Sequence, residues 1–172
     1  MLDHISTSQI GGNIATNAGG IKVLRYGLTR DWVAGLKVVT GTGELLDLNK
    51  GLVKNATGYD FRHLFIGSEG TLGMIVEATI RLAPKSGDLH VLLLAVPEMT
   101  KIIAVLEAFR QKVHLTAYEF FSEAALQHVI HHAGATHPFG SATAFYALIE
   151  YETLAAEDQD ASLAAFEACV EA

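Results

Sequence analysis

Residues 11–20 read Gly11-Gly12-Asn13-Ile14-Ala15-Thr16-Asn17-Ala18-Gly19-Gly20, and residues 66–76 read Ile66-Gly67-Ser68-Glu69-Gly70-Thr71-Leu72-Gly73-Met74-Ile75-Val76. Seven glycines fall within these two charge-poor runs, among Asn, Thr, Ser and short aliphatic residues. Glycine permits positive φ and lacks the Cβ that would hold a ligand away from the backbone. Successive peptide N–H groups in such turns can form an anion site without a lysine. The pattern favours either a surface for a large, partly charged ligand or two tight turns in an ordinary α/β domain.

Neither run has the G-x-G-x-x-G spacing of the Rossmann fingerprint, and the sequence contains no Walker A pattern. Residues 67–73 read G-x-x-G-x-x-G and lead into an apolar run, so we expect a strand after them rather than a helix. Gly41-Thr42-Gly43 lies between two strand-like runs, residues 33–40 and 45–48, which predicts a hairpin turn there. A dinucleotide, if bound, is therefore held by another architecture.

The composition is that of a folded protein. Half of the 172 residues are hydrophobic and 18% are charged. The net charge of −7, with no Lys/Arg cluster, argues against nucleic acid or an anionic membrane as a partner. The lone cysteine, Cys169, excludes an intramolecular disulfide and fits a reducing compartment. With no secretory signal and no long apolar span in the sequence, we expect a cytoplasmic protein.

The segment Pro84-Lys85-Ser86-Gly87-Asp88 divides the chain into two halves. Before it we expect short strands at residues 35–40, 45–48 and 74–82. After it we expect strands at residues 89–96, 115–121 and 144–151, each followed by a helix, opened by Pro97 and running through Phe109, then over residues 122–132 and 158–171. The continuous apolar run 89–96 is typical of a strand covered on both faces.

Four motifs follow one another in the first half: Ile10 to Gly20, Leu24-Arg25-Tyr26-Gly27, Asn55-Ala56-Thr57-Gly58-Tyr59-Asp60, and Leu64 to Gly73. In this order they resemble the FAD-linked oxidases of the vanillyl-alcohol-oxidase type, with a PCMH-type FAD-binding domain. Among these they are most similar to D-2-hydroxyacid dehydrogenases: the glycolate oxidase flavin subunit, D-lactate dehydrogenase and D-2-hydroxyglutarate dehydrogenase. Ala117-Tyr118-Glu119-Phe120 and residues 145–150 resemble the start of that family's substrate-capping domain.

The resemblance implies an α+β fold in two parts. Residues 1–86 correspond to a partial FAD-binding domain, part of its second subdomain, in which helices accompany an antiparallel sheet. Residues 87–172 correspond to the N-terminal part of the FAD-linked oxidase C-terminal domain, or cap, as an incomplete ferredoxin-like unit. The family's pyrophosphate-binding loop and its histidine-rich catalytic and metal-binding segment would lie before and after this chain, so we interpret the chain as the middle of an enzyme.

The resemblance also implies that FAD is the cofactor, with residues 11–20 along the flavin and diphosphate and residues 70–76 toward the adenosine half. The predicted FAD-binding residues are Gly11, Gly12, Asn13, Thr16, Asn17, Ala18, Gly19, Gly20, Gly70, Gly73 and Ile75. Thr16 and Asn17 would lie beside the flavin or ribityl chain, because their side chains both donate and accept. The alternatives are a turn in which Asn17 bonds its own backbone and a plain strand entry at residues 70–76. The polar loop at residues 55–59 would lie near the cofactor.

Other polar residues leave alternatives open. Arg25 and Tyr26 either contact a substrate carboxylate or tie the loop to the domain. His128, His131 and His132 have helical spacing, with His137 nearby, but no carboxylate completes a zinc motif, so we assign no metal ligand. Cys169 has no activating neighbour in sequence, and we expect it to be inert. We assign no catalytic residue within the chain.

The first functional hypothesis is a fragment of an FAD-dependent oxidoreductase that oxidises a D-2-hydroxy acid to the 2-oxo acid by hydride transfer to flavin N5. Its partners would be a small 2-hydroxy acid and an electron acceptor: a quinone, an electron-transfer flavoprotein or a cytochrome. Peripheral attachment to a membrane respiratory chain is an alternative to a free cytoplasmic location. The alternative function is a non-catalytic flavin-binding or structural subunit of an oxidase complex. A cell-wall-precursor reductase of the same flavin fold is disfavoured by its different motifs.

Three expectations follow for the chain by itself. It should bind FAD weakly or not at all, and it should lack dehydrogenase activity, because the pyrophosphate loop and the catalytic histidine of the family lie outside it. In a ferredoxin-like topology the absent strand would pair with residues 89–96. We therefore expect a homo-oligomer formed through that strand edge.

Overall fold

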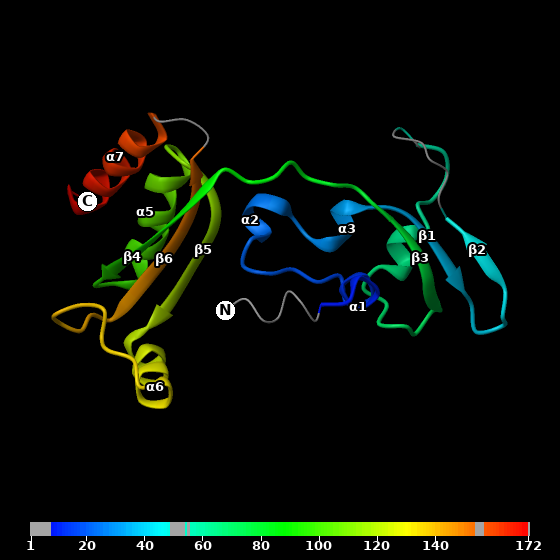
Figure 1. Ribbon diagram of the computed structural model, residues 1–172, viewed down its shortest axis with the longest axis horizontal. Coiled ribbons are helices and arrows are strands. Elements are labelled where there is room, and N and C mark those ends of the chain that lie inside the picture. Colours follow the sequence, from blue (N-terminus) through cyan, green and yellow to red (C-terminus); the bar gives the residue numbers. More distant parts are fainter. Residues whose placement is uncertain (1–7, 49–53, 55, 154–156, 172) are drawn as a thin grey trace. The chain divides into compact units, whose positions relative to one another are not determined.

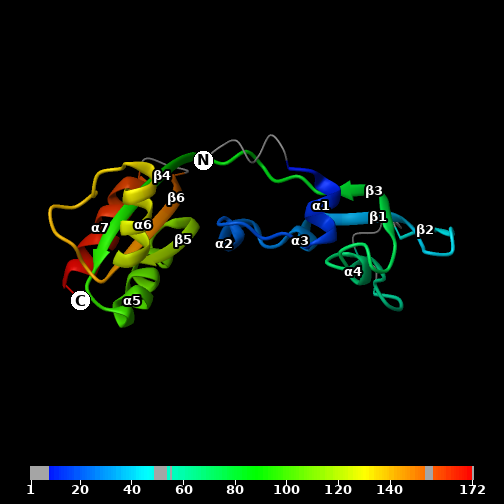
Figure 2. The same ribbon diagram turned by 90° about the horizontal axis from the view of Figure 1, so that it is seen from below.

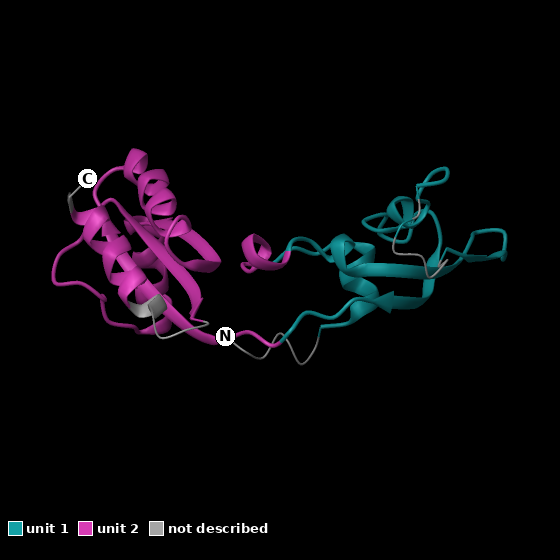
Figure 3. Ribbon diagram, turned by 90° about the horizontal axis from the view of Figure 1, so that it is seen from above, with its two compact units in different colours: residues 1–20, 27–84 teal, residues 21–26, 85–172 magenta. Residues whose placement is uncertain are grey.

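The computed structural model describes residues 8–48, 54, 56–153 and 157–171. The protein divides into two compact units (Figures 1 and 3). Unit 1 comprises Met1–Gly20 and Gly27–Pro84, and unit 2 comprises Ile21–Tyr26 and Lys85–Ala172. The short segment 21–26 therefore belongs to unit 2, although the residues on either side of it belong to unit 1.

Unit 1 is a small antiparallel sheet with short helices. Its strands β1 (Val33–Val39), β2 (Leu45–Asp47) and β3 (Met74–Ile80) pair in the order β2-β1-β3. Its helices are α1 (Ile10–Ala15), α3 (Thr29–Trp32) and α4 (Arg62–Phe65). Figure 2 shows α1 beside β1 and β3. The core of the unit consists of residues that these elements bury together: Ile14, Val33, Leu36, Val38, Phe65 and Ile66.

The turn between β1 and β2 confirms the predicted hairpin. Thr40 N–H donates to Glu44 O at 2.9 Å, and Gly43 N–H donates to Thr40 O at 2.9 Å. Gly43 has φ +83°, which an L side chain rarely adopts. The hairpin turn therefore accounts for a glycine at position 43, and no phosphate-binding role is needed to explain this residue.

Unit 2 alternates strands and helices, as the sequence predicts. Its elements are α2 (Val23–Tyr26), β4 (Asp88–Val96), α5 (Met99–Arg110), β5 (His114–Ser122), α6 (Glu123–Ala133), β6 (Phe145–Thr153) and α7 (Glu157–Glu171). The three strands form an antiparallel sheet in the order β4-β6-β5. A strand inserted antiparallel between two strands that a helix connects is the arrangement of a split βαβ unit. The α+β fold class with antiparallel sheets is confirmed.

Helices α5 and α7 cover one face of this sheet (Figure 1). Phe109 and Ile149 are fully buried between α5 and the sheet, and Ala165 of α7 joins the same core. Helix α6 begins at the predicted cap, where Ser122 Oγ accepts a hydrogen bond from Ala125 N–H at 3.3 Å. It ends at Gly134 with φ +64°, the left-handed conformation in which helices commonly stop.

The structure corrects two expectations. Residues 10–15 form the helix α1 instead of an open loop, although Gly11 and Gly12 are poor helix formers. In addition, β4 is not covered on both faces, since Leu89 and Val91 are 41% and 59% exposed. Its position at an edge of the sheet agrees with the expected ferredoxin-like topology. A continuous apolar run therefore does not show that both faces of a strand are covered. Self-association through β4 stays a prediction.

Candidate functional site

The two glycine-rich runs meet in unit 1. Gly67 N–H donates to Ile14 O at 3.0 Å, and Glu69 N–H donates to Ala15 O at 2.9 Å. These bonds satisfy carbonyls at the C-terminal end of α1, where helices lack intrahelical donors. Ile14 O also accepts from Asn17 N–H at 3.1 Å. Together with the complete burial of Ile14, they explain why a helix forms over two glycines: tertiary contacts override the weak local propensity.

A cavity of about 270 Å³ lies where the runs meet. We call it the glycine-rich cavity; it is lined by Gly11, Gly12, Ala15, Gly70, Gly73, Met74 and Ile75. Five of the predicted cofactor residues, Gly11, Gly12, Gly70, Gly73 and Ile75, thus line one hollow. Sequence reasoning missed Ala15 and Met74, although the helical spacing of Ala15 from Gly11 and Gly12 places the three on one face.

The glycines of the cavity have different roles. A Cβ built on Gly11, Gly12 or Gly70 would meet no atom within 4 Å, so their backbone faces open space. Gly70 also has φ +79°. A Cβ on Gly73 would lie 2.7 Å from Val38 Cγ1 and 2.8 Å from Val39 O, closer than such contacts allow. Gly73 therefore has a packing role between β1 and β3, whereas the other three leave bare backbone at the cavity.

The predicted polar side chains of the first run make contacts inside unit 1. Asn13 Nδ2 donates to Ser8 Oγ at 2.8 Å, and Thr16 Oγ1 donates to Gly12 O at 2.9 Å. Asn17 has φ +49°, and its Oδ1 accepts from Arg30 N–H at 3.0 Å. None of the three lines the glycine-rich cavity. The Asn17 side chain thus bonds the backbone of α3 and not its own backbone, as the turn alternative had it.

The remaining predicted residues, Ala18, Gly19 and Gly20, follow α1 outside regular structure and outside the cavity lining. Ala18 O accepts from the backbone N–H of Thr29 at 3.1 Å and from its hydroxyl at 2.8 Å. This end of the run is therefore fixed to α3. The role of these residues toward FAD stays a prediction.

Asp60, the last residue of the third motif, pairs with Arg62 and organises the end of this loop. Asn55, the first residue of the motif, lies outside the described residues. Arg62 Nη1 donates to Val33 O at 3.2 Å and to Ala34 O at 2.5 Å, and Arg62 also forms an ion pair with Asp60. The hydrogen bond from Arg62 holds the pKa of Asp60 below its ordinary value of 3.8. The sequence motif Tyr59-Asp60 thus anchors the loop to β1, and Tyr59 itself is 89% exposed.

Arg25 is tied to the sheet of unit 2. Its Nε donates to Glu152 Oε1 at 2.8 Å, and Glu152 is only 1% exposed. Its guanidinium carbon also lies 5.5 Å from the centre of the Tyr26 ring. This arrangement favours the tying role for Arg25 over direct contact of its Nε with a substrate carboxylate.

Lys22 anchors the same segment at a second point. Its Nζ lies 3.0 Å from Glu150 Oε1, to which Thr116 Oγ1 donates at 2.5 Å. Burial alone would raise the pKa of Glu150, but the hydrogen bonds from Thr116 and Lys22 hold it below the ordinary value of 4.5. Sequence reasoning missed this pair of acids, although Glu150 and Glu152 alternate on β6 and so share one face of the strand.

The histidines and the cysteine form no metal site within the described residues, where no group of three or more His, Cys, Asp or Glu residues could hold an ion. The rings of His128 and His132 stack on α6 at a centroid distance of 6.4 Å. Burial raises the pKa of the Cys169 thiol, which keeps it in the less reactive protonated form. Across the described part of the chain, every helix is too short or too polar to cross a membrane.

Comparison with known proteins decides the family. Residues 2–49 match the family model of the FAD binding domain, and residues 87–172 match that of the FAD linked oxidases, C-terminal domain, which by itself covers half of the chain. The chain belongs to the FAD-linked oxidases. The predicted family is confirmed, and FAD is the cofactor of that family.

Several relatives of this FAD-linked oxidase chain are dehydrogenases. It is 58% identical to D-2-hydroxyglutarate dehydrogenase of Stutzerimonas stutzeri over 96% of its own length and 36% of the relative. It is 39% identical to D-lactate dehydrogenase of Archaeoglobus fulgidus, over 70% of this chain and 27% of the relative. The glycolate oxidase subunit GlcD of Bacillus subtilis is 51% identical over 45% of this chain and 17% of the relative. The chain spans about a third of the length of the Stutzerimonas stutzeri relative and less of the other two.

The fold also matches solved structures of the same architecture. Alkyldihydroxyacetonephosphate synthase superposes with a TM-score of 0.71 at 21% identity, over 94% of this chain and 32% of that structure. At this identity the match shows the fold alone. The glycine-rich cavity fits part of an FAD molecule, because bare glycine backbone lines it and no acidic side chain does.

Proposed function

We propose that this chain is the part of an FAD-dependent D-2-hydroxyacid dehydrogenase that contacts the cofactor with its two glycine-rich runs. The observation that carries the proposal is the convergence of Gly11, Gly12 and Gly70 on one cavity with their Cβ positions open. The substrate is a small D-2-hydroxy acid of the lactate, glycolate or 2-hydroxyglutarate type. The names of the relatives at 39–58% identity support this substrate class.

The residues of the chain hold and orient the cofactor and do not take part in proton transfer. Bound FAD supplies the hydride acceptor for oxidation of the hydroxy acid. Gly11, Gly12 and Gly70 let FAD approach their peptide groups, and Ile75 gives the cavity an apolar wall. The proposed site also includes Asn13, Thr16, Asn17, Ala18, Gly19 and Gly20. The first four of these fix the path of the backbone through hydrogen bonds within unit 1.

The proposal extends to partners and location. The further partners would be an electron acceptor, namely a quinone, an electron-transfer flavoprotein or a cytochrome, and a second copy of the chain in a homo-oligomer. A cytoplasmic location is supported by the single free thiol of Cys169, although relatives such as the D-2-hydroxyglutarate dehydrogenase of Bos taurus are mitochondrial.

A chimeric enzyme tests the function. This chain replaces the matching segment of the Stutzerimonas stutzeri D-2-hydroxyglutarate dehydrogenase, to which it aligns over 165 residues. FAD content is measured by absorbance, and turnover of D-2-hydroxyglutarate, D-lactate and glycolate is measured with a dye acceptor. We expect a yellow enzyme that oxidises at least one of these acids but not their L-enantiomers where these exist.

Matched variants of the chimera test the site. Gly12→Leu should fill the cavity and lower FAD affinity at least about tenfold, the effect of losing roughly 1.4 kcal/mol of binding. Gly140→Leu is the control, because Gly140 also has open space around its Cβ but lies outside the cavity. Equal FAD loss in both variants would contradict the assigned site. A yellow chimera without turnover on any of the acids would favour the non-catalytic subunit instead.

A further inference from the structure

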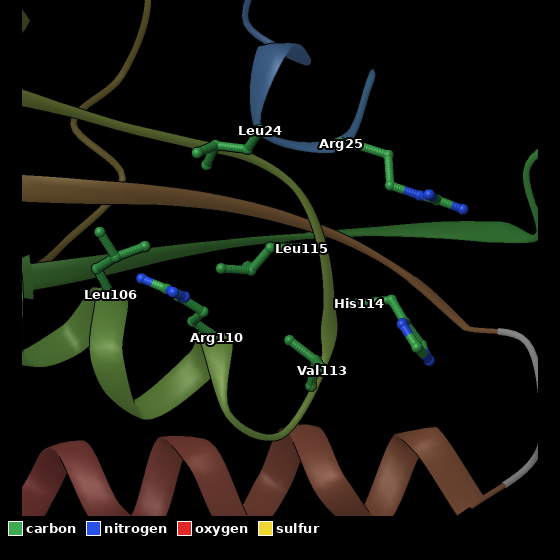
Figure 4. A pocket seen from close by; sticks show the side chains of 7 residues that line it. All are labelled: Leu24, Arg25, Leu106, Arg110, Val113, His114 and Leu115. Carbon is green, nitrogen blue, oxygen red and sulfur yellow. The ribbon is translucent and has the colours of Figure 1, made fainter. Parts of the chain in front are cut away.

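A second cavity lies in unit 2 and shares no residue with the glycine-rich cavity. Its volume is about 670 Å³, within the range of roughly 300–1,000 Å³ that small-molecule sites occupy. It is formed by α2, the C-terminal part of α5 and the start of β5 (Figure 4). We call it the Arg110 cavity.

Its lining combines basic and aliphatic side chains. The basic ones are Arg25, Arg110 and His114, and the aliphatic ones are Leu24, Leu106, Val113 and Leu115. No acidic side chain lines it. In a chain with a net charge of −7, a cavity whose only ionisable lining residues are basic is unexpected on composition. The lining therefore suits a molecule that carries both negative charge and apolar surface.

The basic groups differ in how far they are already neutralised. Arg25 is paired with the buried Glu152. For Arg110, the described residues provide no carboxylate within ion-pair distance. Figure 4 shows the three basic side chains pointing in different directions, so they do not converge on one multiply charged group. The cavity thus offers one guanidinium for one anionic group.

The aliphatic residues surround that guanidinium. Leu106 and Arg110 are four residues apart on α5 and therefore share a face of the helix. In Figure 4 the Arg110 side chain extends back along α5 toward Leu106, and Leu115 lies on the neighbouring strand. Guanidinium groups bind carboxylates by paired N–H donors, and they are less strongly hydrated than ammonium groups. A carboxylate on Arg110 would place its attached chain against Leu24, Leu106 and Leu115.

We propose that the Arg110 cavity binds a monocarboxylate that carries an aliphatic chain, such as a medium-chain fatty acid, with the carboxylate on Arg110 and the chain against the leucines. This site is separate from the proposed cofactor site in its residues, its charge and its ligand. Its occupation does not require FAD, so the proposal stands or falls independently of the proposed function.

Binding of octanoate to the 172-residue chain tests the proposal. Backbone amide NMR titrations are run with sodium octanoate, 1-octanol, sodium acetate and inorganic phosphate. We expect saturable octanoate shifts at the amides of Leu106, Arg110 and Leu115. Acetate and phosphate should bind at least tenfold more weakly than octanoate because they lack the aliphatic chain. Octanol should also bind at least tenfold more weakly because it lacks the negative charge. The amides of residues 11–15 and 70–75 should not move.

Variants decide whether Arg110 is the anchor. Arg110→Gln should weaken octanoate binding about tenfold, or by about 1.4 kcal/mol, because the charge-assisted bond to the carboxylate is lost. Arg81→Gln is the matched control, because Arg81 is exposed and lies outside the cavity. Arg110→Lys should retain part of the affinity. Absence of saturable binding, equal binding of octanol, or equal affinity in Arg110→Gln and Arg81→Gln would each overturn the proposal.

Discussion

The two units both have an apolar core, but their loops and short segments are held in different ways. In unit 1 the loops are held by contacts to backbone atoms: Arg62 binds the carbonyls of Val33 and Ala34, and Gly67 N–H caps α1. In unit 2 a larger apolar core packs under the sheet, and paired carboxylates on β6 hold α2. The difference teaches that the cavity of unit 1 is lined by bare glycine backbone, whereas the Arg110 cavity of unit 2 is lined by long side chains. Variants that act on only one unit can test this contrast.

The largest effect should come from Gly73→Ala in unit 1. The new Cβ would collide with Val38 Cγ1 and with the backbone of Val39, which cannot move away cheaply. We expect the free energy of unfolding of unit 1 to fall by about 3 kcal/mol, at the upper end for overpacking. Trp32, the single tryptophan, lies in α3 of unit 1, so its fluorescence in a urea titration reports this unit. An unchanged urea midpoint would show that β1 and β3 can move apart enough to accommodate the methyl group.

The next effect should come from Arg25→Ala in unit 2. Removing the guanidinium leaves the buried Glu152 carboxylate without its ion-pair partner. The expected loss is about 2 kcal/mol, since Arg25 itself is 45% exposed and water replaces part of the pair. Hydrogen exchange of the β5 and β6 amides measures it. The double variant Arg25→Ala with Glu152→Gln should recover part of the loss; no recovery would contradict the ion-pair explanation.

A smaller effect of opposite sign is expected for Gly12→Ala in unit 1. Alanine is the better helix former, and a Cβ at this position meets no atom within 4 Å. The Trp32-detected stability should rise by about 0.7 kcal/mol. The same methyl group enters the glycine-rich cavity, so FAD affinity in the chimera should fall. A variant that is more stable but binds FAD with the same affinity as the unsubstituted chimera would show that the backbone at Gly12 does not contact FAD.

The smallest effect concerns the pH dependence of unit 2. Because the folded-state pKa of Glu150 lies below 4.5, its ionised form stabilises the fold above that pH, and the stabilisation is lost as the pH falls below it. Lys22→Gln should lower the free energy of unfolding by about 0.5 kcal/mol at neutral pH. The effect is small because the Lys22 side chain is 40% exposed. Stability curves of wild type and Lys22→Gln should converge toward acid pH. Parallel curves from neutral to acid pH would contradict the assignment.

The contrast between the units also decides what could be predicted from sequence. The strands and helices of unit 2 follow hydrophobic periodicity, so β5, α6 and the Ser122 cap were predictable to within a few residues. Helix α1 was not, because its formation depends on the burial of Ile14 and on N–H groups supplied by the distant second run. The apolar run of β4 also could not show that Leu89 and Val91 are exposed, and its place at the sheet edge was expected only from the ferredoxin-like topology.

The candidate site was predictable in part. The glycine spacing, through the family resemblance, indicated that Gly11, Gly12 and Gly70 would line a cofactor surface. It could not distinguish them from Gly73, whose role depends on the position of Val38 on the neighbouring strand. The roles of Arg25 and Asn17 depended on partners far away in sequence, Glu152 and the backbone of Arg30. Long-range pairs of single polar residues leave no periodic signal.

The excursion of residues 21–26 into unit 2 has a consequence for folding kinetics. The Arg25–Glu152 hydrogen bond joins residues 127 positions apart, with most of the chain of unit 1 in the intervening loop. Closing such a loop costs more entropy than forming the hairpin-like contacts within either sheet, and non-local contacts slow folding. Segment 21–26 should therefore dock last, after β5 and β6 have paired. During synthesis, Arg25 can bind Glu152 only after β6 has been translated and has left the ribosome.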